Sequence, residues 1–145
     1  MLHEGKVLLI ENKKAGLFLG PGGHIEPNED PVEALHREVA EEVGIEVEII
    51  AEDRFAHPAV ETLPEPFSLV VVDIAERGKE PAHQHIDFIY AVRPLSFDIR
   101  LQDVEIASYR WVYLNDVAQT SVPPEYPDLI KAVAKYADNI TGSST

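Results

Sequence analysis

The spacing of apolar residues predicts an amphipathic helix in the first third of the chain. Apolar side chains recur there at intervals of three and four residues, as in a helix with one core-facing stripe. The stripe consists of Val32, Leu35, Val39 and Val43. Asp30 suits the N-cap, Glu33 completes a capping box and Pro31 suits the first helical position. Gly44 suits a left-handed cap at the other end, so we expect a helix over residues 31–43.

Short apolar or alternating runs around this helix predict strands. The runs are 6–11, 17–19, 45–50, 54–60, 67–74, 84–92 and 109–114. A second amphipathic helix is predicted over 126–140, followed by a flexible tail over 141–145. Strands mixed with one early and one late helix predict a single α/β (α+β) domain over residues 1–140, with a mixed sheet between helical layers.

The composition is acidic, with 26 Asp and Glu residues against 12 Lys and Arg residues and a net charge of −14. This charge disfavours nucleic acid and anionic membranes as partners, although a divalent metal would let an anionic substrate bind. We find no apolar run long enough to span a bilayer and no signal-peptide pattern. The chain has no cysteine, which excludes thiolate metal sites. We therefore expect a cytoplasmic protein with a small-molecule substrate.

Three carboxylates lie close together on the first predicted helix. Glu38, Glu41 and Glu42 are three and four residues apart, so they cover roughly a third of the helix circumference. Like charges at this spacing destabilise a helix. A bound cation would offset the repulsion, and oxygen ligands favour a hard ion. A solvated acidic face is the alternative interpretation.

The segment GHIEPNEDPVEALHREVAEEVGI, from Gly23 to Ile45, resembles the Nudix box, because every fixed position of that family signature is filled. The flanking runs KVLLIE and YRWVYL are also typical of Nudix proteins. The resemblance implies an α/β/α sandwich around a mixed β-sheet. It also implies hydrolysis, dependent on Mg²⁺ or Mn²⁺, of the pyrophosphate linkage in a nucleoside diphosphate joined to another moiety.

The resemblance implies roles for individual residues of the box. Glu38 and Glu42 would be the main metal ligands, with Glu41 nearby and the carbonyl of Gly22 as a backbone ligand. One of the three glutamates would also accept the proton of the attacking water.

Glu29 and Arg37 are expected to form an ion pair that braces the loop against the helix. Glu105 lies six residues before Trp111, where some Nudix enzymes carry a further acidic ligand or general base. A surface glutamate is an equally good interpretation of Glu105.

Histidines supply further candidates for binding. His24 directly follows the glycine loop and could contact substrate or metal. His83, His85 and Asp87 alternate along a predicted strand and therefore share one face. We expect His24, His85 and Asp87 to bind substrate, and we favour this role over a transition-metal site built from the alternating set.

The box leaves the substrate open between a nucleoside triphosphate, a nucleotide sugar and an ADP-ribose-like molecule. The proline or tyrosine that often marks specificity beyond the box is missing from residues 60–63. A non-catalytic Nudix domain that binds a nucleotide-type ligand as a sensor is the alternative function. An isomerase of isoprenoid diphosphates would need a catalytic cysteine, which is absent.

The sequence also predicts a homodimer. Residues 1–5 alone precede the first long strand, so an edge strand should be short or absent. An exposed sheet edge favours pairing with another chain.

Overall fold

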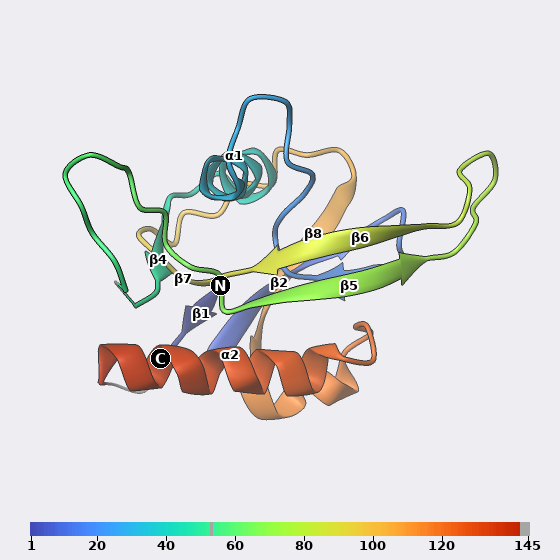
Figure 1. The fold of residues 1–145 in the computed structure, drawn as a ribbon. Helices are drawn as coiled ribbons and strands as arrows, with labels where there is room; N and C mark the ends of the chain where they lie inside the picture. The colour runs from blue at the N-terminus through green and yellow to red at the C-terminus, as the bar shows by residue number, and fades with distance from the viewer. Residues whose placement is uncertain (53, 143–145) are drawn as a thin grey trace.

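The computed structural model describes residues 1–52 and 54–142. Its elements form three layers, with a helix on each side of the strands (Figure 1). Helix α1 (Pro31–Val43) covers one face and helix α2 (Tyr126–Thr141) covers the other. This arrangement confirms the expected α/β/α class. The remaining elements are β1 (Leu2–His3), β2 (Lys6–Asn12), β3 (Leu17–Leu19), β4 (Val47–Ile50), β5 (Ser68–Ile74), β6 (His83–Ile89), β7 (Ala91–Pro94), β8 (Ile106–Tyr113) and the 3-10 helix η1 (Leu114–Gln119).

Strand β2 is the centre of the main sheet. It pairs with β8 along one edge, and with β1 and β3 along the other. Strands β4 and β7 form a second pair, and β5 and β6 form a third. Every named pair in the described part of the chain is antiparallel, whereas the sequence predicts a mixed sheet. The two-residue β1 fits the expectation of a short edge strand.

Two of the strand predictions need correction. Residues 54–60 form no strand, and their apolar members Phe55 and Val60 are 62% and 57% exposed because no core lies beneath them. The run 84–92 is interrupted at Tyr90, because β6 pairs with β5 whereas β7 pairs with β4. An apolar alternation does not reveal a change of pairing partner.

The end of the chain also differs from the prediction. Helix α2 continues to Thr141, and Gly142 ends it in the left-handed region at φ 66°. Residue 141 of the predicted tail is therefore helical, and residues 143–145 lie outside the described part of the chain. No helix among the described residues has the length and apolar character needed to cross a membrane.

The two faces of β2 nucleate two core clusters. Val7 and Leu9 face the cluster that includes the buried side of α2. Leu8 and Ile10 face the other cluster, where Val39 and Val43 of α1 are buried and Leu35 packs alongside. A strand covered on both faces is continuously apolar, which explains the run at residues 7–10. Helix α1 is therefore anchored to the centre of the sheet.

Both ends of α1 are capped. The Asp30 carboxylate accepts hydrogen bonds from the N–H groups of Val32 (2.7 Å) and Glu33 (2.9 Å), and Glu33 accepts from the Asp30 N–H in return (2.9 Å). Gly44 ends the helix at φ 70°, and a Cβ there would lie 2.8 Å from the Gln102 amide nitrogen. The predicted helix bounds, capping box and glycine cap are confirmed.

Replacing Asp30 by alanine is expected to lower the free energy of unfolding by about 1 kcal/mol, because two N–H groups of the first turn lose their acceptor. Asp30→Asn is the matched control, because it keeps an acceptor oxygen and should retain most of the stability. Urea unfolding monitored by circular dichroism measures both. Equal stability of the two variants would contradict the capping role.

Candidate functional site

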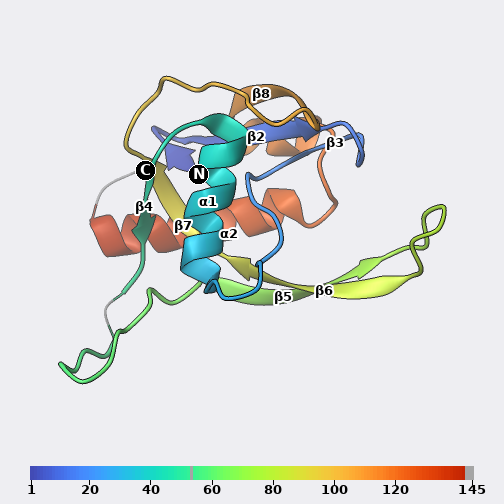
Figure 2. The same cartoon turned by 90° about the horizontal axis from the view of Figure 1, so that it is seen from above.

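The loop between β3 and α1 runs alongside the helix (Figure 2). The Gly22 N–H donates to Glu42 Oε2 at 2.8 Å, and Arg37 Nη2 donates to the His24 carbonyl at 2.9 Å. The loop backbone therefore donates one hydrogen bond to a side chain of α1 and accepts another from a second side chain, and the two bonds hold the loop against the helix.

Arg37 contacts three carboxylates. Its Nε and Nη2 atoms donate to Glu29 Oε1 at 2.9 and 2.7 Å. Its Nη1 atom donates to Glu38 at 2.9 Å and to Glu41 at 3.2 Å. The Glu29–Arg37 ion pair is therefore present. The same guanidinium also bonds to two further carboxylates on α1.

These contacts shift the protonation equilibria of the pair. Hydrogen bonds to Glu29 and then to Glu38 raise the pKa of Arg37 above its usual range. The hydrogen bond from Arg37 is the main cause that lowers the pKa of Glu29. Both groups are therefore held in their charged forms, and the arginine offsets part of the repulsion along α1.

Glu42 is the buried charged residue of this region, with 6% of its surface exposed. Burial raises its pKa to about 7, against the lowering effect of the Gly22 N–H; the charges of Glu38, Asp103 and Glu41 raise it further. A carboxylate in this position is costly to ionise unless a positive charge lies nearby. The site therefore suits a cation.

Gly23 lies directly against Glu38. A Cβ built on Gly23 would be 2.3 Å from the Glu38 carboxyl carbon, so any side chain at this position would have to displace the Glu38 carboxylate. Gly22 has φ 153°, a conformation that favours glycine. The two glycines therefore allow the backbone to approach the carboxylates of the helix.

The donor set fits a hard divalent cation. Three glutamate carboxylates lie on α1, with the backbone of the glycine loop beside Glu38 and Glu42; carboxylate oxygens suit Mg²⁺ or Mn²⁺. Arg37 bonds to Glu38 and Glu41, and no three His, Cys, Asp or Glu side chains of the described residues converge on one point.

Asp103 is an acidic residue that our sequence reasoning missed. It is half-buried, and its charge contributes to the raised pKa of Glu42. Glu105 is exposed, and its backbone rather than its carboxylate bonds to Lys13 and Asp103. Both acids lie in the loop before β8. In the sequence, Asp103 is visible as a second acid two positions before Glu105. Only the packing of the loop shows that Asp103 is the acid whose charge acts on Glu42.

The candidate binding residues lie beside the glycine loop. The rings of His24 and His85 are 5.1 Å apart and nearly perpendicular. Asp87 lies on the same side of β6 as His85. Burial is the main cause that raises the pKa of Tyr126, the Gly20 N–H lowers it, and the charges of Glu125 and then Asp87 raise it further. The Tyr126 hydroxyl accepts from that N–H at 3.3 Å. The structure thus brings His24, His85 and Asp87 to one border of the loop.

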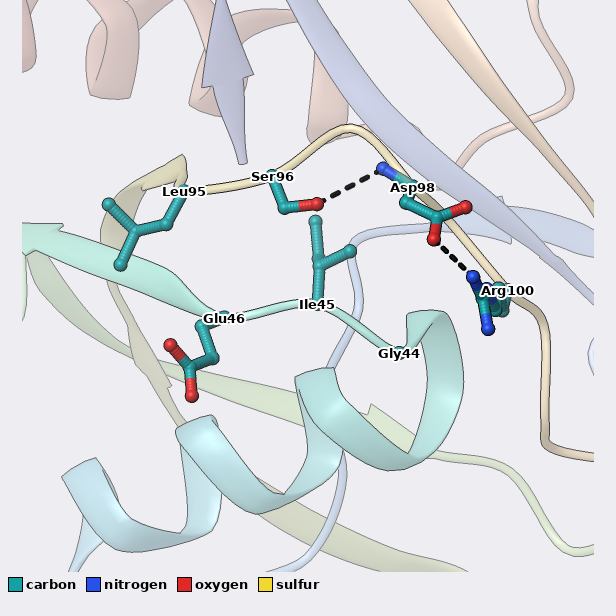
Figure 3. Close-up of a pocket in the computed structure, with 7 residues that line it drawn as sticks. All are labelled: Gly44, Ile45, Glu46, Leu95, Ser96, Asp98 and Arg100. Carbon is teal, nitrogen blue, oxygen red and sulfur yellow. Dashed lines mark hydrogen bonds and ion pairs between the residues drawn. The ribbon is translucent and has the colours of Figure 1, made fainter.

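A surface pocket of about 400 Å³ lies at the C-terminal end of α1, beside the glycine that ends the helix (Figure 3). Its lining includes the ion pair between Arg100 and Asp98, and Ser96 Oγ accepts from the Asp98 N–H. None of the predicted site residues lines it. The pocket is therefore distinct from the carboxylate site.

Residues 1–133 match the NUDIX domain model, and the chain belongs to the Nudix family. It is 29% identical over 126 residues to Nudix hydrolase 10 of Arabidopsis thaliana. It is 30% identical over 107 residues to a probable DHNTP pyrophosphohydrolase of Lactococcus lactis. The matches cover 81% and 74% of this chain, but the chain spans only 39% and 55% of the two relatives.

Solved structures share the fold. A NUDIX-family hydrolase from Clostridium perfringens is 27% identical, with a TM-score of 0.75 over 93% of this chain and 89% of that one. The NUDIX domain of Shewanella oneidensis NrtR, complexed with ADP ribose, is 19% identical, with a TM-score of 0.57 over 90% of this chain and 76% of that one. The latter likeness shows the fold alone. Nudix hydrolases generally use divalent metal cations.

Gly23→Ala is expected to weaken Mn²⁺ binding by about 10-fold or more, because the added methyl group displaces the Glu38 carboxylate from the loop. The fold should survive, since the clash is with the end of a flexible side chain. Gly20→Ala is the matched control, because a Cβ there meets nothing within 4 Å. Isothermal titration calorimetry compares the two, and equal affinities would contradict the close approach.

Proposed function

We propose that the chain is a Nudix pyrophosphohydrolase dependent on Mg²⁺ or Mn²⁺. Its reaction would be hydrolysis of the pyrophosphate linkage in a nucleoside diphosphate joined to another moiety. The observation that carries this proposal is the buried Glu42 carboxylate, bonded to the Gly22 N–H and surrounded by other acids in a Nudix-family chain.

In this proposal Glu38, Glu41, Glu42 and the Gly22 carbonyl hold the divalent ion. The ion supplies charge neutralisation of the pyrophosphate and acidification of water. Arg37 bonds to Glu29 and to the His24 carbonyl, and so keeps the loop over the helix. The brace thereby positions the ligands without contacting the reacting atoms.

One of the three glutamates, or an acid of the loop before β8, accepts the proton of the attacking water. We keep Glu105 as a candidate from the sequence, but the electrostatic influence of Asp103 on Glu42 supports Asp103 as the better placed of the two. The exposed Glu105 would have to change its position to reach the same group.

His24, His85 and Asp87 would contact the substrate beside the cleaved linkage, because they border the glycine loop. Imidazole and carboxylate groups can hydrogen-bond to a sugar, a base or a phosphate. We therefore retain nucleoside triphosphates, nucleotide sugars and ADP-ribose-like molecules as the substrate class. The names of the relatives, one for a DHNTP pyrophosphohydrolase and one for a complex with ADP ribose, support assays of both types.

A sensor that binds a nucleotide-type ligand without hydrolysis is the second candidate. The contacts from Arg37 to Glu38 and Glu41 favour it, because they occupy carboxylates that a metal would need. The complete Nudix box favours the enzyme, because the carboxylates that hydrolysis needs, Glu38, Glu41 and Glu42, are all present.

Glu38→Gln and Glu42→Gln are each expected to lower kcat on the best substrate by on the order of 100-fold or more, because each removes a charged metal ligand. A panel of nucleoside triphosphates, nucleotide sugars and ADP-ribose with Mg²⁺ or Mn²⁺ identifies that substrate, with the nucleoside monophosphate product measured by chromatography. Glu46→Gln is the control, since Glu46 is exposed just beyond the helix. Full turnover by both variants would refute the metal-ligand assignment, and tight binding without turnover by the wild type would support the sensor.

We also propose that the protein is a homodimer. Strands β5 and β6 form a two-stranded ribbon that projects from the body (Figure 2). Its outer face carries two cross-strand apolar pairs, Leu69 with Phe88 and Val71 with Ile86, whose exposed fractions are 57%, 40%, 62% and 65%. Isolated two-stranded ribbons are marginally stable, and a second copy packed on this face would remove the apolar surface from water.

The wild type is expected to sediment as a dimer at micromolar concentration, and Val71→Glu as a monomer, because a carboxylate would be buried in the apolar interface. Val104→Glu is the control, since Val104 is 84% exposed in the loop before β8. A wild-type monomer in sedimentation velocity would end the proposal.

A further inference from the structure

The inner face of the β5–β6 ribbon carries a group of metal-binding side chains separate from the carboxylates of α1. His83 and His85 lie on this face, and Glu80 lies in the turn that precedes them. We propose that these three residues form a second metal site, for a borderline ion of the Zn²⁺ type, in which His85 would reach the substrate through the ion. The site does not depend on the hydrolytic activity of the chain.

The two imidazoles already point at one another. His83 Nε2 and His85 Nε2 are 3.0 Å apart. Two ligand atoms bound to one tetrahedral zinc ion at about 2.0–2.1 Å would be roughly 3.3 Å apart. Residues i and i+2 of a strand share a face, and pairing of β6 with β5 holds both histidine backbones in register. Small side-chain rotations would therefore place both nitrogens on one ion.

The tautomer of His83 is set for metal binding. His83 Nδ1 lies 2.8 Å from the Pro81 carbonyl oxygen. A carbonyl only accepts hydrogen bonds, so Nδ1 carries the proton and Nε2 of the neutral ring presents its lone pair. Histidines that bind metals use this arrangement, with the second ring nitrogen donating to a carbonyl or carboxylate. Without metal, the Nε2–H group of His85 donates to this lone pair, and metal binding would displace that proton to Nδ1 or to solvent.

Glu80 is the third donor. Its Oε1 atom lies 3.9 Å from His83 Nε2, and its Oε2 atom lies 3.7 Å from Lys14 Nζ in the turn between β2 and β3. Two backbone hydrogen bonds with Arg77, at 2.9 and 3.0 Å, hold Glu80 in the turn. No three such donors among the described residues yet converge, and rotation of the exposed Glu80 side chain is the movement that would complete the set.

The ligand chemistry separates this site from the carboxylate site. Imidazole nitrogens suit Zn²⁺, Co²⁺ and Ni²⁺, whereas carboxylate and carbonyl oxygens suit Mg²⁺ and Mn²⁺. The His24 ring is 5.1 Å from that of His85, so an ion on the ribbon would lie beside the glycine loop. Its fourth position would be open to water or to a group of the substrate, as in zinc sites with three protein ligands.

Titration of the metal-free protein with Co²⁺ tests the proposal, because four-coordinate Co²⁺ absorbs visible light far more strongly than the six-coordinate ion in an all-oxygen site. We expect the strong spectrum at one ion per chain in the wild type. His83→Ala and His85→Ala should lose the spectrum, with affinity lowered on the order of 100-fold, and Glu80→Gln should weaken binding less. His57→Ala is the control, because His57 is exposed in another loop.

The double variant Glu38→Gln, Glu42→Gln separates the two sites. It should keep the strong Co²⁺ spectrum and one equivalent of Zn²⁺ in equilibrium dialysis. Circular dichroism and thermal melts establish that each variant is folded, and His83→Asn and His85→Asn replace any alanine variant that is not. A wild type with only the weak six-coordinate spectrum would overturn the proposal, as would histidine variants that bind Co²⁺ like the wild type.

Discussion

The guanidinium of Arg37 connects the glycine loop to the acidic face of α1, and the geometry of the site depends on that connection. It donates to Glu29 and the His24 carbonyl on the loop side and to Glu38 and Glu41 on the helix side. Without a positive charge at this point, the carboxylates would repel one another and the loop would lose its main contact with the helix. One side chain therefore positions the loop and moderates the charge that a cation later meets.

The acidic site lies on a rigid base. Helix α1 is capped at both ends, and its buried side packs on the centre of the main sheet through Val39 and Val43. The site can therefore keep Glu42 buried and bonded to the loop although its ionised form is disfavoured there. The projecting ribbon has much less support, since one of its faces remains exposed. The carboxylates therefore have the firmer support of the two, as a site that must hold an ion requires.

The local elements could be predicted where a short-range rule decides them. The bounds of α1 follow from Asp30, Pro31 and Gly44, because caps act within one turn, and β2 follows from its apolar run. The family resemblance of residues 23–45 and the α/β/α class were likewise available from the chain alone. The failures are long-range. Residues 54–60 have a strand-like pattern but no partner, and the run 84–92 changes partners at Tyr90.

For the site, the sequence determined which carboxylates share a face of α1, because helical geometry relates residues three and four positions apart. Only the tertiary structure decided that Glu42 is buried, that Asp103 rather than Glu105 influences its charge, and that His24 meets His85. The burial of Glu42, the proximity of Asp103 to it and the contact of His85 with His24 all involve chain segments that are far apart in sequence. Packing of the core brings these segments together. The residue types therefore came from the sequence, and their electrostatic environment came from the fold.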